Sequence, residues 1–226
     1  MSDIFREVDE DIRQEKFRRL WDRFGPWVIG VAVLIVVGTG GYRGWLYWQE
    51  TQSHQSGDSF IEAARLSGEG KYEEAAEIYG ELADGIGGYP AISRMRFATD
   101  LANSGKAPEA LAEFDTLSND AKLSPPLRDV AALRAGYLAV DLEGYSSVAD
   151  RVEGLTGETG SFRGAAREIL ALSAWKSGDV GTARKWISAL QSDPETPMEI
   201  NSRITLLSDV IRAQHGEVPA ASEGNE

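Results

Sequence analysis

The chain contains no cysteine and only two histidines among its 226 residues. Without thiols it forms no disulfide, no thiolate metal site and no lipid-modified amino-terminal cysteine. His54 and His215 lack metal-ligand spacing. We find no phosphate loop, nucleophile elbow or paired-carboxylate motif. The sequence predicts no enzyme, cofactor or metal site; an enzyme would need a reactive cluster assembled from distant parts of the chain.

No segment alternates apolar and polar residues over a length that requires a β-strand. The predicted fold class is therefore all-α.

Charge is also missing from one stretch, the nineteen residues from Phe24 to Tyr42, bounded by Arg23 and Arg43. As a helix rising about 1.5 Å per residue it reaches roughly 28 Å, close to the ~30 Å hydrocarbon core of a bilayer. Aromatic residues flank both ends, as is typical of membrane interfaces. A cleaved signal peptide would carry a small-residue cleavage site, but bulky residues follow here. Residues 24–48 are predicted to form a transmembrane helix with an aromatic exit.

The basic residues around this helix predict its orientation. Short segments rich in Lys and Arg tend to stay in the cytoplasm, and only Arg43 is basic in the twenty residues after Tyr42. Six basic residues precede the span: Arg6, Arg13, Lys16, Arg18, Arg19 and Arg23. The amino terminus is predicted to be cytoplasmic, the helix to cross the inner membrane once, and the remaining domain to be periplasmic.

Most of the net charge belongs to that remaining domain. The whole chain carries −13, and residues 1–23 hold six basic and seven acidic groups, which leaves −12 for the residues that follow. An acidic field disfavours binding to nucleic acid and to anionic membrane surfaces. The charge itself identifies no partner. The lipid bilayer is the expected partner of the apolar span.

A repeat follows the membrane segment, in which a glycine precedes an alanine by five residues. Successive glycines are 35, 39 and 34 residues apart, near the ~34-residue period of tetratricopeptide helix pairs. The pairs are Gly70 and Ala75, Gly105 and Ala110, Gly144 and Ala149, and Gly178 and Ala183. We expect an α-solenoid of about four helix pairs, because each pair leaves an apolar face that its neighbour must cover.

The third unit departs from the pattern. Seven residues before each glycine stands Ala63, Ala98 or Ala171, but Tyr137 in the third unit, where Gly136 is adjacent. The apolar stripe of its second helix also slips by one residue, to Val148.

Four regions result: a cytoplasmic amphipathic segment (1–23), the transmembrane helix (24–48), a tetratricopeptide-like domain (49–215) and a disordered tail (216–226). Apolar residues at helical spacing between Met198 and Gln214 predict a final helix that caps the stack. The first segment either lies on the membrane, docks on a partner or is weakly ordered.

Two sets of residues are candidates for contacts with partners. Gly40 and Gly44 form a small-xxx-small pair that allows another membrane helix to approach closely. Helical repeats present a surface of first helices to peptides or partner helices. Arginines in the predicted first helices are either contacts on that surface or solvated charges: Arg65, Arg94, Arg134 and Arg167.

The chain resembles the single-pass ancillary subunit family of the bacterial SecYEG translocon. The resemblance rests on Leu-Trp-Asp-Arg-Phe-Gly at 20–25, the glycine-bearing span, Gly-Trp-Leu-Tyr-Trp-Gln at 44–49 and the four glycine-to-alanine units. It implies association with SecYEG and with a membrane-anchored periplasmic chaperone of the prolyl-isomerase type. The alternative is a tetratricopeptide scaffold in cell-envelope or division assembly.

Overall fold

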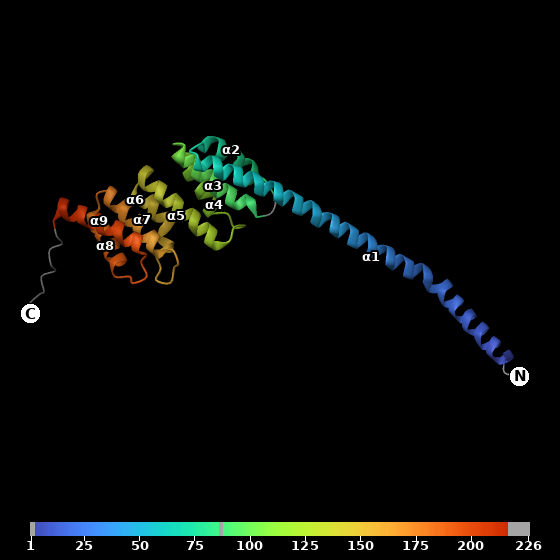
Figure 1. Cartoon of the computed structure of the whole chain (residues 1–226). Coiled ribbons are helices and arrows are strands. Elements are labelled where there is room, and N and C mark those ends of the chain that lie inside the picture. The colour runs from blue at the N-terminus through green and yellow to red at the C-terminus, as the bar shows by residue number, and fades with distance from the viewer. Residues whose placement is uncertain (1–2, 86–87, 217–226) are drawn as a thin grey trace, which may run out of the picture. The chain divides into compact units, whose positions relative to one another are not determined.

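The computed structural model describes residues 3–85 and 88–216, but not the side chains of 3–17, 19–22 and 49–54. The described chain is helical throughout, without a strand, and Figure 1 shows its succession of helices. Their bounds are α1 Asp3–Gly68, α2 Tyr72–Ala83, α3 Tyr89–Asn103, α4 Ala107–Ser118, α5 Pro125–Leu142, α6 Tyr145–Val152, the 3₁₀ turn η1 Glu153–Leu155, α7 Arg163–Lys176, α8 Val180–Gln191 and α9 Met198–His215. The predicted fold class, an N-terminal apolar helix followed by a helical solenoid, is confirmed.

The chain divides into two units between Gln55 and Ser56. The boundary lies within α1, whose last turns belong to the second unit. Most side chains of the predicted amphipathic segment 1–23 lie outside the described residues, as does the predicted disordered tail 216–226 except for Gly216.

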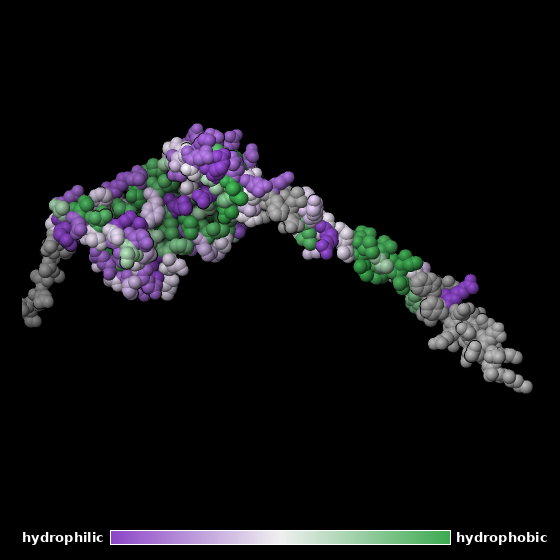
Figure 2. Space-filling model, viewed as in Figure 1, coloured by the Kyte–Doolittle hydropathy of each residue, from purple (hydrophilic) through white to green (hydrophobic). Residues whose placement is uncertain are grey.

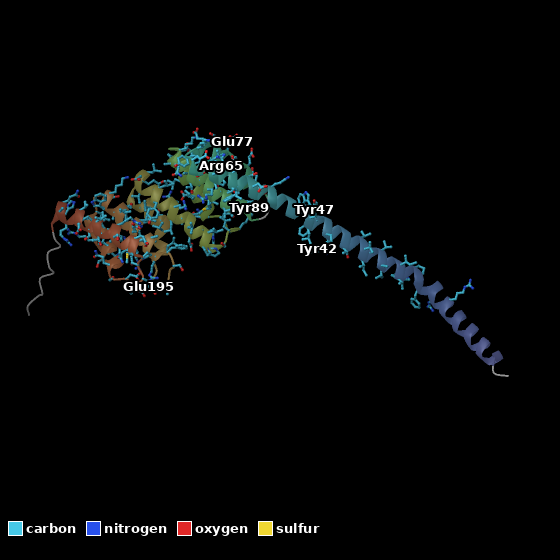
Figure 3. All side chains as sticks on the ribbon, in the orientation of Figure 1. Tyr42, Tyr47, Arg65, Glu77, Tyr89 and Glu195 are labelled. Carbon is cyan, nitrogen blue, oxygen red and sulfur yellow. The ribbon has the colours of Figure 1, made fainter. Side chains whose placement is uncertain are left out.

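The first unit contains a segment suited to a bilayer. Arg23–Trp48 is 26 residues long with a mean hydropathy of 1.8, and only 6% of its apolar window is buried. Figure 2 shows apolar colour on this part of α1, and Figure 3 shows Tyr42 and Tyr47 projecting from it. The rings of Tyr42 and Trp45 lie 6.3 Å apart.

In the second unit, each first helix pairs with the second helix that follows it. The first helices are the end of α1, α3, α5 and α7, the second helices are α2, α4, α6 and α8, and α9 closes the series. Successive helices pack against each other, and α5 also contacts α7, as α7 contacts α9. Apolar side chains of both helices fill the core; in the first pair, the Phe60 ring lies 5.2 Å from Tyr79 and 5.6 Å from Tyr89.

Three of the four predicted glycines make the same turn between paired helices. Gly70, Gly105 and Gly178 adopt φ values of 80°, 85° and 81°, in the left-handed region that L side chains avoid. At Gly105, the Lys106 amide donates to the Leu101 carbonyl at 2.9 Å and the Gly105 amide to Ala102 at 3.1 Å. This pair of bonds is the Schellman motif, which satisfies carbonyls that the helix end leaves free.

The third turn differs from the predicted pattern by one residue. The second helix begins two residues after Gly105 but only one residue after Gly144, which has φ −85° and ψ 167°. Glu143, with φ −133°, therefore occupies the turn position, and an extended backbone replaces the left-handed turn. Val148, fully buried, takes the place that Ala110 holds in its helix, and Ala149 lies one position further on.

This one-residue shift identifies Gly136 as the small residue of the third repeat. Seven positions before Glu143 stands Gly136, so it corresponds to Ala63, Ala98 and Ala171, which are all fully buried. A Cβ added at Gly136 would lie 2.7 Å from Val152 Cγ1 and 3.3 Å from Ile169 Cγ2. The helices approach so closely here that even alanine does not fit without a shift.

The two ends of the solenoid differ. Asp58 and Glu62 of α1 are exposed at the positions where α7 buries Ala166 and Leu170 against the preceding repeat. On α9, one face buries four isoleucine and leucine side chains, while the other face exposes Leu206 and Val210 beside polar side chains such as Ser202 and Asp209. Carboxylates thus replace two apolar contacts at the α1 end, whereas α9 keeps exposed apolar side chains among polar ones.

The two kinds of turn give a matched test. Gly105→Ser should lose about 1–2 kcal/mol of unfolding free energy, because serine is strained in the left-handed region. Gly144→Ser should be neutral or stabilising, because serine is a favoured N-cap in extended backbone, and no atom lies within 4 Å of either added Cβ. Urea unfolding of the detergent-solubilised chain, followed by circular dichroism, measures both. Equal losses would contradict the assignment of the two turns.

Candidate functional site

The first helices of successive repeats are joined by side-chain hydrogen bonds, and the surface they form is called the first-helix face below. Between α1 and α3, Ser67 Oγ donates to Asp100 Oδ1 at 2.7 Å. Between α3 and α5, Arg134 Nη1 donates to Thr99 Oγ1 at 3.1 Å. These partners are 33 and 35 residues apart, one repeat length. The first-helix face is thus held together by contacts that recur with the repeat.

Glu168 is the most heavily bonded residue of this series. Its carboxylate is 1% exposed and accepts bonds from the Tyr137 hydroxyl at 2.8 Å and from Arg203 at 2.5 and 2.7 Å. It therefore links α5, α7 and α9. Burial first, and then the bond to Glu168, raises the pKa of Tyr137, and the same carboxylate raises the pKa of Arg203. A buried carboxylate is costly without such donors.

The second helices carry a parallel set of links. Lys106 Nζ lies 2.9 Å from Glu73 Oε1, and Arg151 makes a bidentate contact with Asp115 at 2.8 Å for each bond. The Lys106 pair is well exposed and contributes little, whereas the Arg151 fork is only 20% exposed on the arginine side. The repeats are therefore coupled on both helix layers.

The arginines predicted as partner contacts are largely bound within the chain. Arg65 pairs with Glu62 and Glu69 on its own helix. Arg134 contacts no described carboxylate within 4.0 Å; it bonds Thr99 and lies 6.0 Å above the Phe114 ring.

Arg94 and Arg167 do not stand free on the surface, because both bond groups of the chain itself. Arg94 Nε lies 2.8 Å from Glu113 Oε1, and its side chain is 24% exposed. Arg167 donates to the Thr156 carbonyl and lies 3.0 Å from Asp193, with 11% of its side chain exposed. Each of these arginines is less than one repeat away from its carboxylate partner, so the repeat pattern in the sequence did not indicate the pairs.

Several apolar and basic side chains remain accessible on the first helices. Ile92 of α3 and Tyr137 of α5 are 38% and 39% exposed, and Leu206 of α9 is 67% exposed. Arg96 is exposed and forms no ion pair among the described residues. An apolar surface with a few free cations suits a protein segment.

The remaining predicted positions occupy separate places. In the first unit, a Cβ added at Gly40 or Gly44 would meet no atom within 4 Å, so close approach of a second helix is sterically open. His215 is exposed at the end of α9, and the His54 side chain lies outside the described residues. Across the described side chains, no group of three His, Asp or Glu residues is arranged to hold a metal ion.

Comparison with known proteins agrees with this architecture. Residues 18–193 match the tetratricopeptide repeat-like domain family, which covers most of the chain, so the protein belongs to that family. Neither a curated protein nor a solved structure matches it. The tetratricopeptide-like domain is a protein-interaction fold, and the described surface on the first helices is the candidate site for that interaction.

The buried carboxylate makes a prediction for the α5–α7–α9 link. Arg203→Met should cost about 1–3 kcal/mol of unfolding free energy, because it leaves Glu168 charged and buried with two of its three hydrogen bonds removed. Adding Glu168→Gln to that variant should recover part of the loss, since the amide carries no charge. Urea unfolding of the four chains in a double-mutant cycle measures this coupling. Strict additivity would contradict it.

Proposed function

We propose that the protein is a membrane-anchored adaptor that binds other proteins through its first-helix face. Membership of the tetratricopeptide repeat-like family carries the proposal. The exposed side chains Ile92, Tyr137 and Leu206 support it, because they offer apolar area on α3, α5 and α9. The apolar segment Arg23–Trp48 supports the membrane anchor.

We further propose a single crossing of the inner membrane, with the amino terminus in the cytoplasm and the repeat domain in the periplasm. The basic residues before the span, and their near absence after it, support this orientation. The acidic character of the domain suits a soluble body that is not drawn to an anionic lipid surface.

The resemblance to the translocon's ancillary subunits suggests the partners. We propose that the adaptor associates with SecYEG and with a membrane-anchored periplasmic chaperone, and assists proteins as they are exported. Gly40 and Gly44 are the proposed contact for a neighbouring membrane helix, because nothing in the described chain occupies the space beside them.

Topology can be tested directly because the chain has no cysteine. Single cysteines at Ser2 and at Ala121, which is exposed between α4 and α5, provide the two probes. In Gram-negative cells with a permeabilised outer membrane, an impermeant maleimide should label Ala121→Cys and not Ser2→Cys. The reverse labelling would overturn the orientation, and extraction of the protein by alkaline carbonate would overturn the anchor.

Site-specific photo-crosslinking tests the binding face. A photoreactive amino acid at Arg96 or Leu206 should yield adducts with other proteins in native membranes, identified by mass spectrometry. The same probe at Glu77 or Ala112, exposed on second helices, is the matched control. Adducts with translocon subunits or a periplasmic chaperone support the specific assignment, and mid-cell division proteins in their place support the scaffold alternative. Equal yields of adducts from the probes at Arg96 or Leu206 and from the second-helix controls would contradict the proposed binding face.

A further inference from the structure

A pocket of about 360 Å³ lies between α8 and α9, on the opposite side of α9 from Leu206 and Val210. On α8 it is lined by positions i, i+3, i+4 and i+7, one face of the helix, and α9 closes it from the other side. The lining residues are Arg184, Ile187, Ser188, Gln191, Ser208, Ile211, Arg212 and Gly216. The pocket is thus distinct from the first-helix face.

Two guanidinium groups make this pocket locally positive. Arg184 Nη2 donates to the Gly216 carbonyl at 2.5 Å, and no carboxylate of the described residues lies within 4.0 Å of Arg184. Among the described residues Arg212 pairs only with Asp209, at 3.2 Å, and both side chains are more than half exposed, so solvent screens the pair. None of the described residues that line the pocket is acidic. Such a concentration of positive charge is unusual in a chain whose residues from Phe24 onward carry a net charge of −12.

The other residues that line the pocket restrict which anions could bind in it. Ile187 and Ile211 are 4% and 1% exposed and contribute an apolar floor. The hydroxyl groups of Ser188 and Ser208 offer hydrogen bonds beside it. A ligand that fills the pocket therefore combines a negative group with an apolar one. The acidic domain repels extended polyanions such as nucleic acid, which leaves a short segment with one or two carboxylates.

We infer that this pocket binds a segment of a partner protein that presents a carboxylate next to an apolar side chain. The guanidinium groups of Arg184 and Arg212 bind the carboxylate, and the apolar side chain packs on Ile187 and Ile211. Charge-assisted bonds from arginine to carboxylate are among the stronger polar contacts in proteins. The inference rests on the proposed protein-binding function and adds a second contact site to it.

Fluorescence anisotropy on the full chain in lipid nanodiscs tests the inference, with a fluorescein-labelled Leu-Glu-Leu-Glu tetrapeptide as probe. Binding should be saturable and should weaken about tenfold or more in Arg184→Gln, which loses a charge-assisted hydrogen bond. Lys122→Gln, which removes an exposed cation between α4 and α5 outside both proposed contact sites, is the control and should bind like the wild type. The neutral Leu-Gln-Leu-Gln peptide should not bind.

The alternative outcomes are distinct. Absence of binding overturns the inference, as does equal weakening in Arg184→Gln and Lys122→Gln, which would indicate general attraction to charge. A chain ending at Gly216 removes the glutamates of residues 217–226. If the peptide binds only to that shorter chain, the chain's own segment is the occupant and the partner assignment is wrong. First-helix adducts that persist while the peptide fails to bind would leave the proposed function intact and refute this site alone.

Discussion

The close crossing of each first helix with its second helix is the constraint on which the solenoid depends. At that crossing every repeat places a small buried residue, Ala63, Ala98, Gly136 or Ala171. Larger side chains would push the two helices apart and expose the apolar stripe that each presents to the other. In the third repeat, a Cβ at position 136 would collide with Val152 and crowd Ile169, so only glycine fits there. The sequence around the crossing can vary widely once this position is small.

From that crossing the rest of the architecture follows by repetition. A pair of helices covers one apolar face and leaves another, which the next pair covers, so stability accumulates from neighbour to neighbour. At one end of the series, Asp58 and Glu62 stand where a further repeat would need apolar side chains, and at the other end α9 closes the series. Hydrogen bonds with a repeat-length spacing, such as Arg134 to Thr99, fix the register between neighbours. Burial of the apolar faces supplies most of the folding free energy. The polar links then favour one register of neighbouring repeats over shifted registers.

Much of this architecture could be predicted from the sequence, because the residues that indicate it lie close together in the chain. Glycine after a helix and apolar residues at helical spacing are signals within a few residues of each other, and they predicted the final helix and four glycine turns, three of which are left-handed. The register of the third unit was harder, because Gly144 stands one residue from the true turn and an extended Glu143 replaces the expected geometry. Glu168 was missed for a different reason. Its donors, Tyr137 and Arg203, lie about one repeat away on either side, and only the packed solenoid brings them together.

The distribution of charge connects this architecture to binding. Most arginines of the repeat domain are neutralised by the chain's own carboxylates, as Arg94, Arg151 and Arg167 show. These pairs position helices and leave little attraction for a partner. The net acidity of the domain opposes any partner that is itself strongly acidic, and long-range attraction weakens within about 10 Å at moderate salt. In the proposed adaptor, selectivity comes from short-range complementarity: the exposed apolar side chains, and the few cations, such as Arg96 and Arg184, that pair with no carboxylate of the described residues.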